Sequence, residues 1–595
     1  MSANTIRQAV LRSLVGVLLL APPLLLLILL CRDGVNVPYW DQWDDDIAGL
    51  FEKYKTGRLL FADFWAQHNE SRLFLPRILF LFLGNLTRWN VGYEIAATFL
   101  AACLITIAVW RLEQPAIQKN PKIRWAIFFI SSLMIFSPAQ SQSWLWGLEL
   151  IVYVPAACIL FGLLVLQSQA RQSTKWILCA VLATISTWTF SNGMLAWIVF
   201  FPALLFFGSG KNRRKNNLAA LCWLAGFTGN AALYFHNYQF QPTGGFWQKL
   251  WTDPFPIAQY FFAFLGQLLV GQDAPHSLGA AALIGLCLVI LFGAICLHIF
   301  RRGKNPALFV GALPWLTLGG YSILSDCLAT AGRAALIGPD QALSPRYGIF
   351  SACLIVSLLH LIPMTAFHGL ALKENSKPAK SRACVTLPAF CGCVILLYAL
   401  ALPSAIFDMQ LICLERLEAR SCLDFIDVIP EQPAMTACLF PNYQKLKRTA
   451  DSLDQLGVLD FPLLKTNRIS FFSSSLAPGS PACGSIESCR QTGGAEFEFT
   501  GWAVSVSRKT PADCVLFTCE SAGTDPVIFS LMDRRVLRPD LAAKFKDQTY
   551  FVAGWRKTFS GAGLPTGLLQ IKAWAYDTRH RKITPLAGVI QIDNN

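Results

Sequence analysis

The sequence predicts a multi-spanning α-helical membrane protein that carries a C-terminal, mainly-β domain outside the bilayer. Hydrophobic residues make up 54% of the 595 residues and charged residues only 14%, whereas soluble domains carry about 25% charged residues. Long apolar runs follow one another up to residue 407. Beyond it, turn residues, charges and short alternating segments take over, and no further run is long enough to span.

The first membrane span is expected at residues 10–30. This apolar run has about 20 residues, which is enough to cross a bilayer. Arg7 and Arg12 accompany its start in the charge order of a signal peptide, but no small-residue cleavage site follows. We therefore expect a helix that is retained in the mature protein.

Further apolar runs predict ten more spans, which gives eleven in all. They cover residues 91–110, 123–137, 144–168, 175–190, 193–208, 217–236, 278–300, 306–325, 346–368 and 384–407. The fourth and fifth of these ten are short, and a re-entrant hairpin around Ser191–Gly193 is the alternative for them. The runs at 73–84 and 257–271 are shorter still, so we expect interfacial or re-entrant pieces on the outer face.

Basic loops between these runs predict the orientation. The net charge of +14 is informative here as a map of which loops lie inside. Membrane lipid is an expected partner of such a chain, and nucleic acid is not. Lys and Arg collect on the cytoplasmic side of membrane proteins. The basic loops lie at 111–124, 171–175, 211–217, 301–304 and 373–382. Placing them inside puts the N-terminus in the cytoplasm and the C-terminal domain outside.

Three regions follow from this map: a transmembrane domain at 1–408 with an acidic outer loop at 32–90, a connecting region of mixed structure at 409–490, and a β-sandwich-like domain at 491–595. The outer location allows disulfides. The local pairs to consider first are Cys483 with Cys489 and Cys514 with Cys519.

Three tryptophans of the last region, Trp502, Trp555 and Trp574, lie on or beside expected strands. Exposed aromatic rings suit the flat apolar faces of sugars, so these residues are candidate glycan-binding positions. The alternative, which is the commoner outcome in a sandwich, is that they fill the core.

The stretch "PYWDQWDDD" directly after the first span places carboxylates at the membrane surface. Apolar residues recur at helical spacing over 40–55, which predicts an amphipathic helix lying on the membrane. Asp41 and Asp44 then share a neighbouring face. They are either the polar face of a surface helix or candidates for a general base.

Two further constellations are expected on the same outer face. His68, Glu70 and Arg72 in "FWAQHNESRLFLPR" combine groups that can abstract a proton with groups that can hold a phosphate; a salt-bridged loop is the alternative. Arg333 and the Arg346–Tyr347 pair in the loop at 330–350 provide cations that can hold an anionic headgroup. Ordinary interfacial anchoring is the alternative for these.

The layout of residues 1–410 resembles the GT-C glycosyltransferases, which include the protein O-mannosyltransferases and the aminoarabinose transferase of lipid A. "PYWDQWD" and "QHNESRLFLPR" are similar to segments of bacterial members, and "SPRYGIF" is similar to a late Arg–Tyr motif. The chain departs from the family at the acidic pair after the first helix, which is Asp41–Gln42 here. The base is therefore Asp41 or Asp44.

This resemblance implies an enzyme of the bacterial inner membrane. It implies a polyprenyl-phosphate-linked sugar as donor and an extracytoplasmic glycan, lipid or protein as acceptor. It requires no cofactor, although some relatives bind a divalent cation such as Mg²⁺ or Mn²⁺.

The same resemblance implies roles for the residues above. An aspartate would deprotonate the acceptor hydroxyl, with inversion at the sugar's anomeric carbon, while basic residues neutralise the leaving phosphate. The residues are Asp41 or Asp44 as base, His68 and Glu70 for orientation, and Arg72, Arg333, Arg346 and Tyr347 around the phosphate.

Two other functions remain open. A transporter or flippase of lipid-linked sugars would bury charges at mid-membrane and show two-half symmetry, whereas these runs hold few charges and show no repeat. An O-antigen ligase or polymerase would have a large central outer loop, and the loop at 237–277 is of moderate length.

Overall fold

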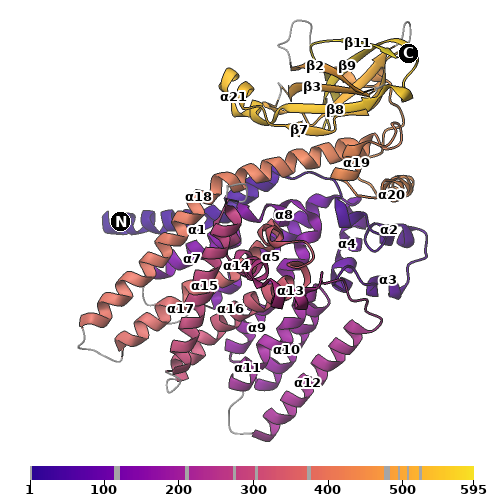
Figure 1. Ribbon diagram of the computed structural model, residues 1–595. Coiled ribbons are helices and arrows are strands. Elements are labelled where there is room, and N and C mark those ends of the chain that lie inside the picture. Colours follow the sequence, from indigo (N-terminus) through magenta and orange to yellow (C-terminus); the bar gives the residue numbers. More distant parts are fainter. Residues whose placement is uncertain are drawn as a thin grey trace. The chain divides into compact units, whose positions relative to one another are not determined.

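The computed structural model describes residues 3–112, 121–207, 213–271, 276–301, 306–371, 377–474, 483–493, 496–505, 508–520 and 525–594 (Figure 1). Parts of four predicted basic loops, at 113–120, 211–212, 302–304 and 373–376, lie outside these residues. The chain forms two compact units. The helical unit comprises Met1–Gly34, Leu60–Leu79 and Tyr93–Gln410, and the mixed unit comprises Val35–Leu59, Phe80–Gly92 and Leu411–Asn595. The boundaries of the three regions expected from the sequence, at 1–408, 409–490 and 491–595, stay a prediction.

The helical unit is built from α-helices. Its helices are α1 (Ala3–Asp33), α3 (Phe61–Trp65), α5 (Val91–Arg111), α7 (Pro121–Ile135), α8 (Ser141–Leu145), α9 (Leu150–Gln167), α10 (Gln172–Thr187), α11 (Leu195–Phe207), α12 (Arg213–Phe235), α13 (Phe246–Thr252), α14 (Pro254–Gly266), α15 (Ser277–Arg301), α16 (Pro306–Arg333) and α17 (Gly348–Ala371). The bounds of α4 (Phe74–Thr87) and α18 (Lys377–Asp424) cross the division between the units.

Eight helices among the described residues are long and apolar enough to cross a membrane. They are Val91–Arg111, Pro121–Leu145, Gly147–Gln167, Asn216–Phe235, Ser277–Arg301, Leu308–Arg333, Pro345–Thr365 and Thr386–Asp424. This confirms the coarse prediction of a multi-spanning helical protein. The count of eleven stays a prediction, because α10 and α11 have only 16 and 13 residues.

The two short helices α10 and α11 meet at the "SNG" turn. The turn is a 3-10 helix, Ser191–Met194. A Cβ at Gly193 would lie 1.8 Å from the carbonyl oxygen of Ser186, so a side chain there would collide with the backbone of α10. Glycine therefore permits the chain to reverse within a few residues.

Two glycines bring α14 and α15 into backbone contact. A Cβ at Gly266 would lie 2.0 Å from the Ala281 oxygen, and one at Gly285 would lie 1.8 Å from the Phe262 oxygen. Small residues allow such close approach between membrane helices. The C-terminal half of α14 is buried in the protein, and the interfacial or re-entrant placement of the piece at 257–271 stays a prediction.

In the mixed unit, the prediction of one helix over 40–55 is wrong. The segment forms a 3-10 turn, Trp40–Trp43, and a separate helix α2 (Ala48–Lys55). Trp40 has a positive φ of 47°, and Asp44 is extended. The apolar side chains serve packing within the protein, because Trp43 and Phe51 contact Trp89 with ring centroids 5.6 and 4.9 Å apart.

The C-terminal part of the mixed unit is an all-β region of two sheets, which confirms the coarse β prediction. One sheet has the order β1-β10-β9-β5-β6, with β11 also paired to β9, and the other has the order β2-β3-β8-β7, with β4 paired to β3. The strands are β1 (Ser473–Ser474), β2 (Gly484–Gly493), β3 (Glu496–Ser505), β4 (Thr510–Pro511), β5 (Cys514–Glu520), β6 (Val527–Leu531), β7 (Arg534–Val536), β8 (Gly554–Ser560), β9 (Gly567–Asp577), β10 (Lys582–Pro585) and β11 (Ile590–Asn594). Short helices α19 (Pro433–Cys438), α20 (Tyr443–Gln455) and α21 (Pro539–Phe545) complete the unit.

Aromatic side chains join the two sheets. Phe517 of one sheet contacts Phe499 and Trp555 of the other, with ring centroids 6.3 and 5.3 Å apart. All three rings are buried. The alternating pattern of β3 places its apolar residues on this inner face.

Neither disulfide expected from the sequence is formed, because Cys489, Cys514 and Cys519 are free thiols. Cys514 and Cys519 are the first and sixth residues of strand β5. Five steps along a strand separate two Cα atoms by about 16 Å, whereas a disulfide needs a separation below about 7 Å. Cys489 lies within β2, and the same argument separates it from Cys483.

We predict that Gly285→Ala destabilises the helical unit by about 1–3 kcal/mol, because the added methyl group forces α14 away from α15. The measurement is thermal unfolding of the purified protein in detergent. Gly293→Ala on the same helix is the control, since nothing lies within 4 Å of its Cβ position. Equal midpoints for the two variants would contradict the close helix contact.

Candidate functional site

The candidate site begins with a tight turn in the "QHNES" segment of the helical unit. The backbones of His68 and Ser71 exchange hydrogen bonds of 2.8 and 2.7 Å. Between them, Asn69 adopts a φ of 48°, a left-handed conformation that asparagine tolerates better than most residues. Asn69 and Glu70 therefore form the tip of a two-residue turn.

Side chains near the end of α12 fix this turn in place. The hydroxyl groups of Tyr234 and Tyr238 donate to the Glu70 carbonyl at 2.9 and 3.1 Å. The Gln67 side chain donates to the Gln239 carbonyl and accepts from the Gln239 amide, at 2.8 and 2.9 Å. Burial, and secondly the nearby Glu70 carboxylate, raises the pKa of Tyr238. Its hydroxyl group therefore remains a donor at neutral pH.

Arg72 anchors the same turn through hydrogen bonds to the backbone. Its guanidinium donates to three backbone carbonyls at 2.5–2.6 Å, and the side chain is almost fully buried. The acceptors are Tyr234, Trp65 and His236. Burial lowers the pKa of Arg72, but an arginine remains charged at any physiological pH. The contacts show a structural role, and the predicted contact of Arg72 with a phosphate stays a prediction.

A pocket of about 340 Å³ opens beside the turn. Most of its lining is apolar, and the side chains come from α11, α12, α14, α16, α17 and the "SNG" turn. The apolar lining residues include Phe190, Leu195, Ile198, Phe235, Phe264, Leu328 and Phe350. Three of the residues singled out in the sequence, Glu70, Arg333 and Tyr347, line this pocket together. Ligand pockets commonly combine apolar walls with a few polar groups in this way.

The charged group of the pocket is the ion pair between Arg333 and Glu70. One terminal nitrogen of Arg333 lies 3.1 Å from each carboxylate oxygen. The side chains are 25% and 39% exposed, so water screens the pair and its net contribution to stability is small. Arg333 is the last residue of α16, where the helix dipole favours a cation. A phosphate can replace Glu70 as its partner, because arginine binds carboxylates and phosphates through the same geometry.

Tyr347 and Arg346 precede α17. They belong to a 3-10 turn, Pro345–Tyr347, and this turn opens a membrane-length helix, Pro345–Thr365. The Tyr347 ring contacts Phe264 at 4.9 Å and faces the pocket, whereas Arg346 is absent from the described lining. The Arg346 guanidinium lies 5.3 Å from the centroid of the Tyr347 ring.

Asp326 is the functional candidate that sequence reasoning missed. It is fully buried within the membrane-length helix Leu308–Arg333. Thr330 donates to its Oδ1 at 3.0 Å, but its Oδ2 has no hydrogen-bond partner among the described residues. The predicted span ended one residue earlier, at 325. The sequence feature that could have identified Asp326 is a carboxylate at the point where an apolar helix continues. Ionisable residues at membrane depth are rare and commonly functional.

A buried tyrosine lies close to this carboxylate. The Tyr260 hydroxyl group interacts electrostatically with Tyr347, Arg333 and Asp326. Neither Tyr260 nor Tyr347 has a hydrogen-bond partner for its hydroxyl group among the described residues. Polar groups without partners therefore lie next to the Arg333 end of the pocket.

The two candidate bases, Asp41 and Asp44, belong to the mixed unit. Lys445 on α20 donates to Asp44 at 2.9 Å and lies 3.4 Å from Asp45. Burial opposes the charge of Lys445, but the hydrogen bond and charge of Asp44 raise the pKa of the lysine above its ordinary value. Asp44 is thus held as a paired carboxylate. Asp41 lies in the 3-10 turn Trp40–Trp43.

The three tryptophans of the β region have different surroundings. Trp555 is buried between the sheets, where a sugar cannot reach its ring, so the core alternative applies to it. Trp502 is partly exposed on β3 and packs on Phe545 and Tyr550. Trp574 is partly exposed on β9, and its indole donates to Thr518 at 2.9 Å. Glycan binding by Trp502 and Trp574 stays a prediction.

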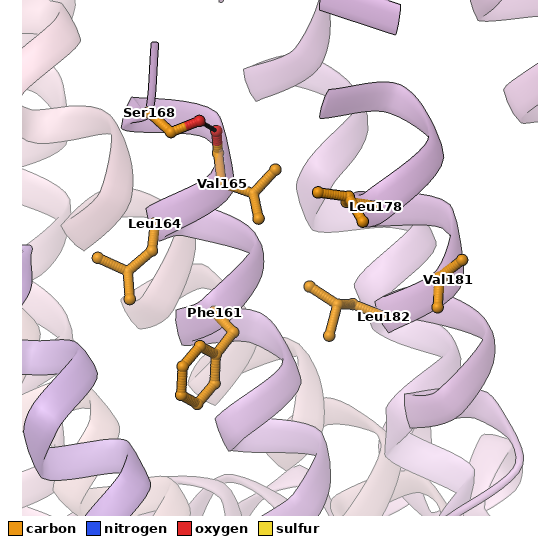
Figure 2. A pocket seen from close by; sticks show the side chains of 7 residues that line it. All are labelled: Phe161, Leu164, Val165, Ser168, Leu178, Val181 and Leu182. Atoms are coloured by element: carbon orange, nitrogen blue, oxygen red, sulfur yellow. Dashed lines mark hydrogen bonds between the residues drawn. The ribbon is translucent and has the colours of Figure 1, made fainter. Parts of the chain in front are cut away.

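A second cavity, of about 430 Å³, lies between α9 and α10 (Figure 2). Its lining is Phe161, Leu164, Val165, Ser168, Leu178, Val181 and Leu182. The Ser168 hydroxyl group donates to the Val165 carbonyl at 2.7 Å. No charged side chain is among these residues, so the cavity offers little to orient a polar ligand. We therefore place the candidate site at the Glu70–Arg333 pocket.

That pocket does not by itself fit a divalent cation. Glu70 is the one carboxylate among the described lining residues, and Arg333 engages both of its oxygens. Mg²⁺ needs several oxygen ligands. The optional cation implied by the sequence stays a prediction.

Comparisons with known proteins add no assignment: no family model, no curated protein and no solved structure matches the chain.

We predict that Arg72→Lys lowers the thermal stability of the protein, because one ammonium group cannot serve three carbonyls and each unsatisfied buried acceptor costs about 1–3 kcal/mol. Arg171→Lys is the matched control, since Arg171 is exposed. The measurement is the midpoint of thermal unfolding in detergent. An unchanged midpoint for Arg72→Lys would show that the three hydrogen bonds do not anchor the turn.

Proposed function

We propose that the protein is a membrane glycosyltransferase of the GT-C type, which moves a sugar from a polyprenyl-phosphate donor to an extracytoplasmic acceptor. The observation that carries this proposal is the pocket in the helical unit, where the Arg333–Glu70 pair lies among apolar side chains. A lipid-linked phosphate combines an anion with an apolar chain, and the pocket offers partners for both.

Arg333 is the proposed phosphate ligand. When the donor enters, its phosphate replaces the Glu70 carboxylate at the guanidinium, and this exchange costs little because the pair is screened. As the bond to the sugar breaks, negative charge grows on the phosphate, and a fixed cation stabilises it. Tyr347, whose hydroxyl group lacks a hydrogen-bond partner among the described residues, supplies a further donor, and Arg346 is the second candidate cation.

The proposed base is Asp41, with Asp44 as the alternative. A carboxylate that is paired with a lysine is stabilised in its charged form and is a weaker base. Lys445 pairs with Asp44 in this way, and both aspartates stay candidates for the base. Glu70, once displaced from Arg333, and His68 are proposed to orient the acceptor hydroxyl group.

The sequence resemblance supports the remaining parts of the proposal. The membrane-length helices are compatible with a multi-pass protein, and we propose the bacterial inner membrane as its location. In that arrangement the C-terminal β region lies on the extracytoplasmic side, together with an acceptor that is a cell-envelope glycan, lipid or protein.

We predict that Arg333→Gln lowers sugar transfer by about 10²-fold, the usual effect of removing one donor that stabilises a developing charge. The assay uses purified protein in lipid vesicles, radiolabelled polyprenyl-phosphate sugars and cell-envelope acceptors. Arg301→Gln is the matched control, because Arg301 is the exposed last residue of the neighbouring helix α15. Asp41→Asn tests the base in parallel.

Two results would count against the transferase. One is the absence of labelled product from the wild type with every donor tested. The other is an equal rate in Arg333→Gln and Arg301→Gln, which would remove the pocket from the reaction.

One observation favours the alternative of a transporter for lipid-linked sugars. Transporters place ionisable groups inside the membrane to couple ion or proton movement. Asp326 is a buried carboxylate of this kind, and one of its oxygens has no hydrogen-bond partner in the described part of the chain. The predicted spans hold few such charges, and this scarcity is a feature of the sequence that speaks against a transporter.

We predict that the wild type and Asp326→Asn move labelled polyprenyl-phosphate sugar across vesicles no faster than protein-free vesicles do. The readout is the fraction of label that a membrane-impermeant reagent can reach over time. Translocation by the wild type that Asp326→Asn abolishes, without any transfer to acceptor, would establish the transporter instead.

A further inference from the structure

We propose that a cluster of exposed apolar side chains beside the pocket inserts into the headgroup region of a phospholipid bilayer. The cluster lies in the helical unit, and we call it the aromatic rim. Its six side chains are between 51% and 85% exposed. They are Phe240, Trp247, Trp251, Phe255, Leu336 and Ile337.

The rim is built from two segments that contact one another. A Cβ at Gly244 would lie 2.5 Å from the Cα of Leu336, so the two backbones are in contact. Lys249 donates from its ammonium group to the Ala335 carbonyl at 2.6 Å. The segment at 240–255 is thereby fixed against the segment at 335–337.

The composition of α13 suits a membrane interface. Trp247 and Trp251 are four residues apart, so they share one face of the helix. Lys249 is the single charged residue of α13, and its hydrogen bond to Ala335 uses the ammonium group. Tryptophan is enriched where membrane proteins meet the headgroup layer, because its ring is apolar and its N–H is polar. Helices of this kind bind by burying an apolar face at the boundary.

The rim begins where a lipid-facing helix ends. The membrane-length helix Asn216–Phe235 buries little of its surface in the protein, and leucines such as Leu221 are exposed along it. Its last residue, Phe235, stacks on Phe240 of the rim with ring centroids 6.0 Å apart. The end of a spanning helix lies at the bilayer surface, so the adjoining rim is placed at headgroup depth.

This continuity identifies the bilayer as the occupant of the surface, because the stacked rings of Phe235 and Phe240 join the lipid-facing helix directly to the rim. A second copy of the chain or another protein is an outcome that the experiment can detect. The inference does not rest on sugar transfer, since a transporter would be anchored in the same way.

The rim also locates the mouth of the pocket. Phe235 and Tyr238 line the pocket, and both contact Phe240. Arg333 of the pocket lies three residues before Leu336 of the rim. The pocket therefore opens next to lipid headgroups, where the phosphate of a membrane lipid is found.

The test measures whether Trp247 and Trp251 are quenched by lipid. The whole protein is reconstituted in phosphatidylcholine vesicles whose acyl chains carry bromine either near the headgroup or near the bilayer centre. The emission of Trp247→Phe/Trp251→Phe is subtracted from that of the wild type, which isolates two of the 18 tryptophans. Trp502→Phe, a partly exposed tryptophan on a β-strand, is the matched control.

We expect the isolated emission to be quenched about twofold more by shallow than by deep bromine, because interfacial tryptophans stay near the headgroups. The emission isolated with Trp502→Phe should be insensitive to bromine. Emission from the rim that acrylamide quenches and bromolipid does not would overturn the proposal. Protection from both quenchers would also overturn it, since a protein would then cover the rim. If the double variant does not fold, the single variants give the same subtraction.

Discussion

The buried guanidinium of Arg72 is the interaction on which the candidate site depends. Its three hydrogen bonds join the backbone at Trp65 to the end of α12, two segments that lie more than 160 residues apart in the chain. A buried carbonyl without a hydrogen-bond partner is costly. Moving the turn that carries Glu70 would therefore raise the free energy of the folded protein. Arg72 therefore holds the backbone of the Glu70 turn in place, whereas the Glu70 and Arg333 side chains can exchange partners.

The pocket combines polar groups of two kinds. Glu70 and Arg333 satisfy one another but are partly exposed, so either can change partner. Asp326, Tyr260 and Tyr347 are buried, and each keeps a polar atom that has no hydrogen-bond partner within the described ranges. Buried unsatisfied groups are uncommon in folded proteins and commonly mark a function or an unseen water or ion. They lie near Arg333, so this region is where we place the candidate site.

Much of the architecture could be predicted from local sequence patterns. The apolar run at 278–300 corresponds to α15, and the alternating stretch "GLLQIKAWAYD" is strand β9. These elements follow from periodicity, which is a property of neighbouring residues. The pattern over 40–55 was misleading because a tertiary contact decides its conformation: Trp43 and Phe51 pack on Trp89, and no local signal encodes that packing.

The site was less predictable than the fold for the same reason. Sequence reasoning grouped Glu70, Arg333 and Tyr347 as residues of one membrane face, and they do line one pocket. It could not show that the Arg72 guanidinium is hydrogen-bonded to backbone carbonyls, because most of these carbonyls are distant in the chain. It also missed Asp326, since the predicted span stopped at 325 while α16 continues to Arg333.

The ion pair of the pocket has a consequence for turnover. A ligand anion at Arg333 leaves the Glu70 carboxylate displaced but still tethered nearby by the turn. That carboxylate is a competitor at a high and constant local concentration, so it limits how tightly any anion is held and accelerates its departure. A site built in this way gives up affinity for fast release, which would suit the charged lipid product of the proposed transfer reaction.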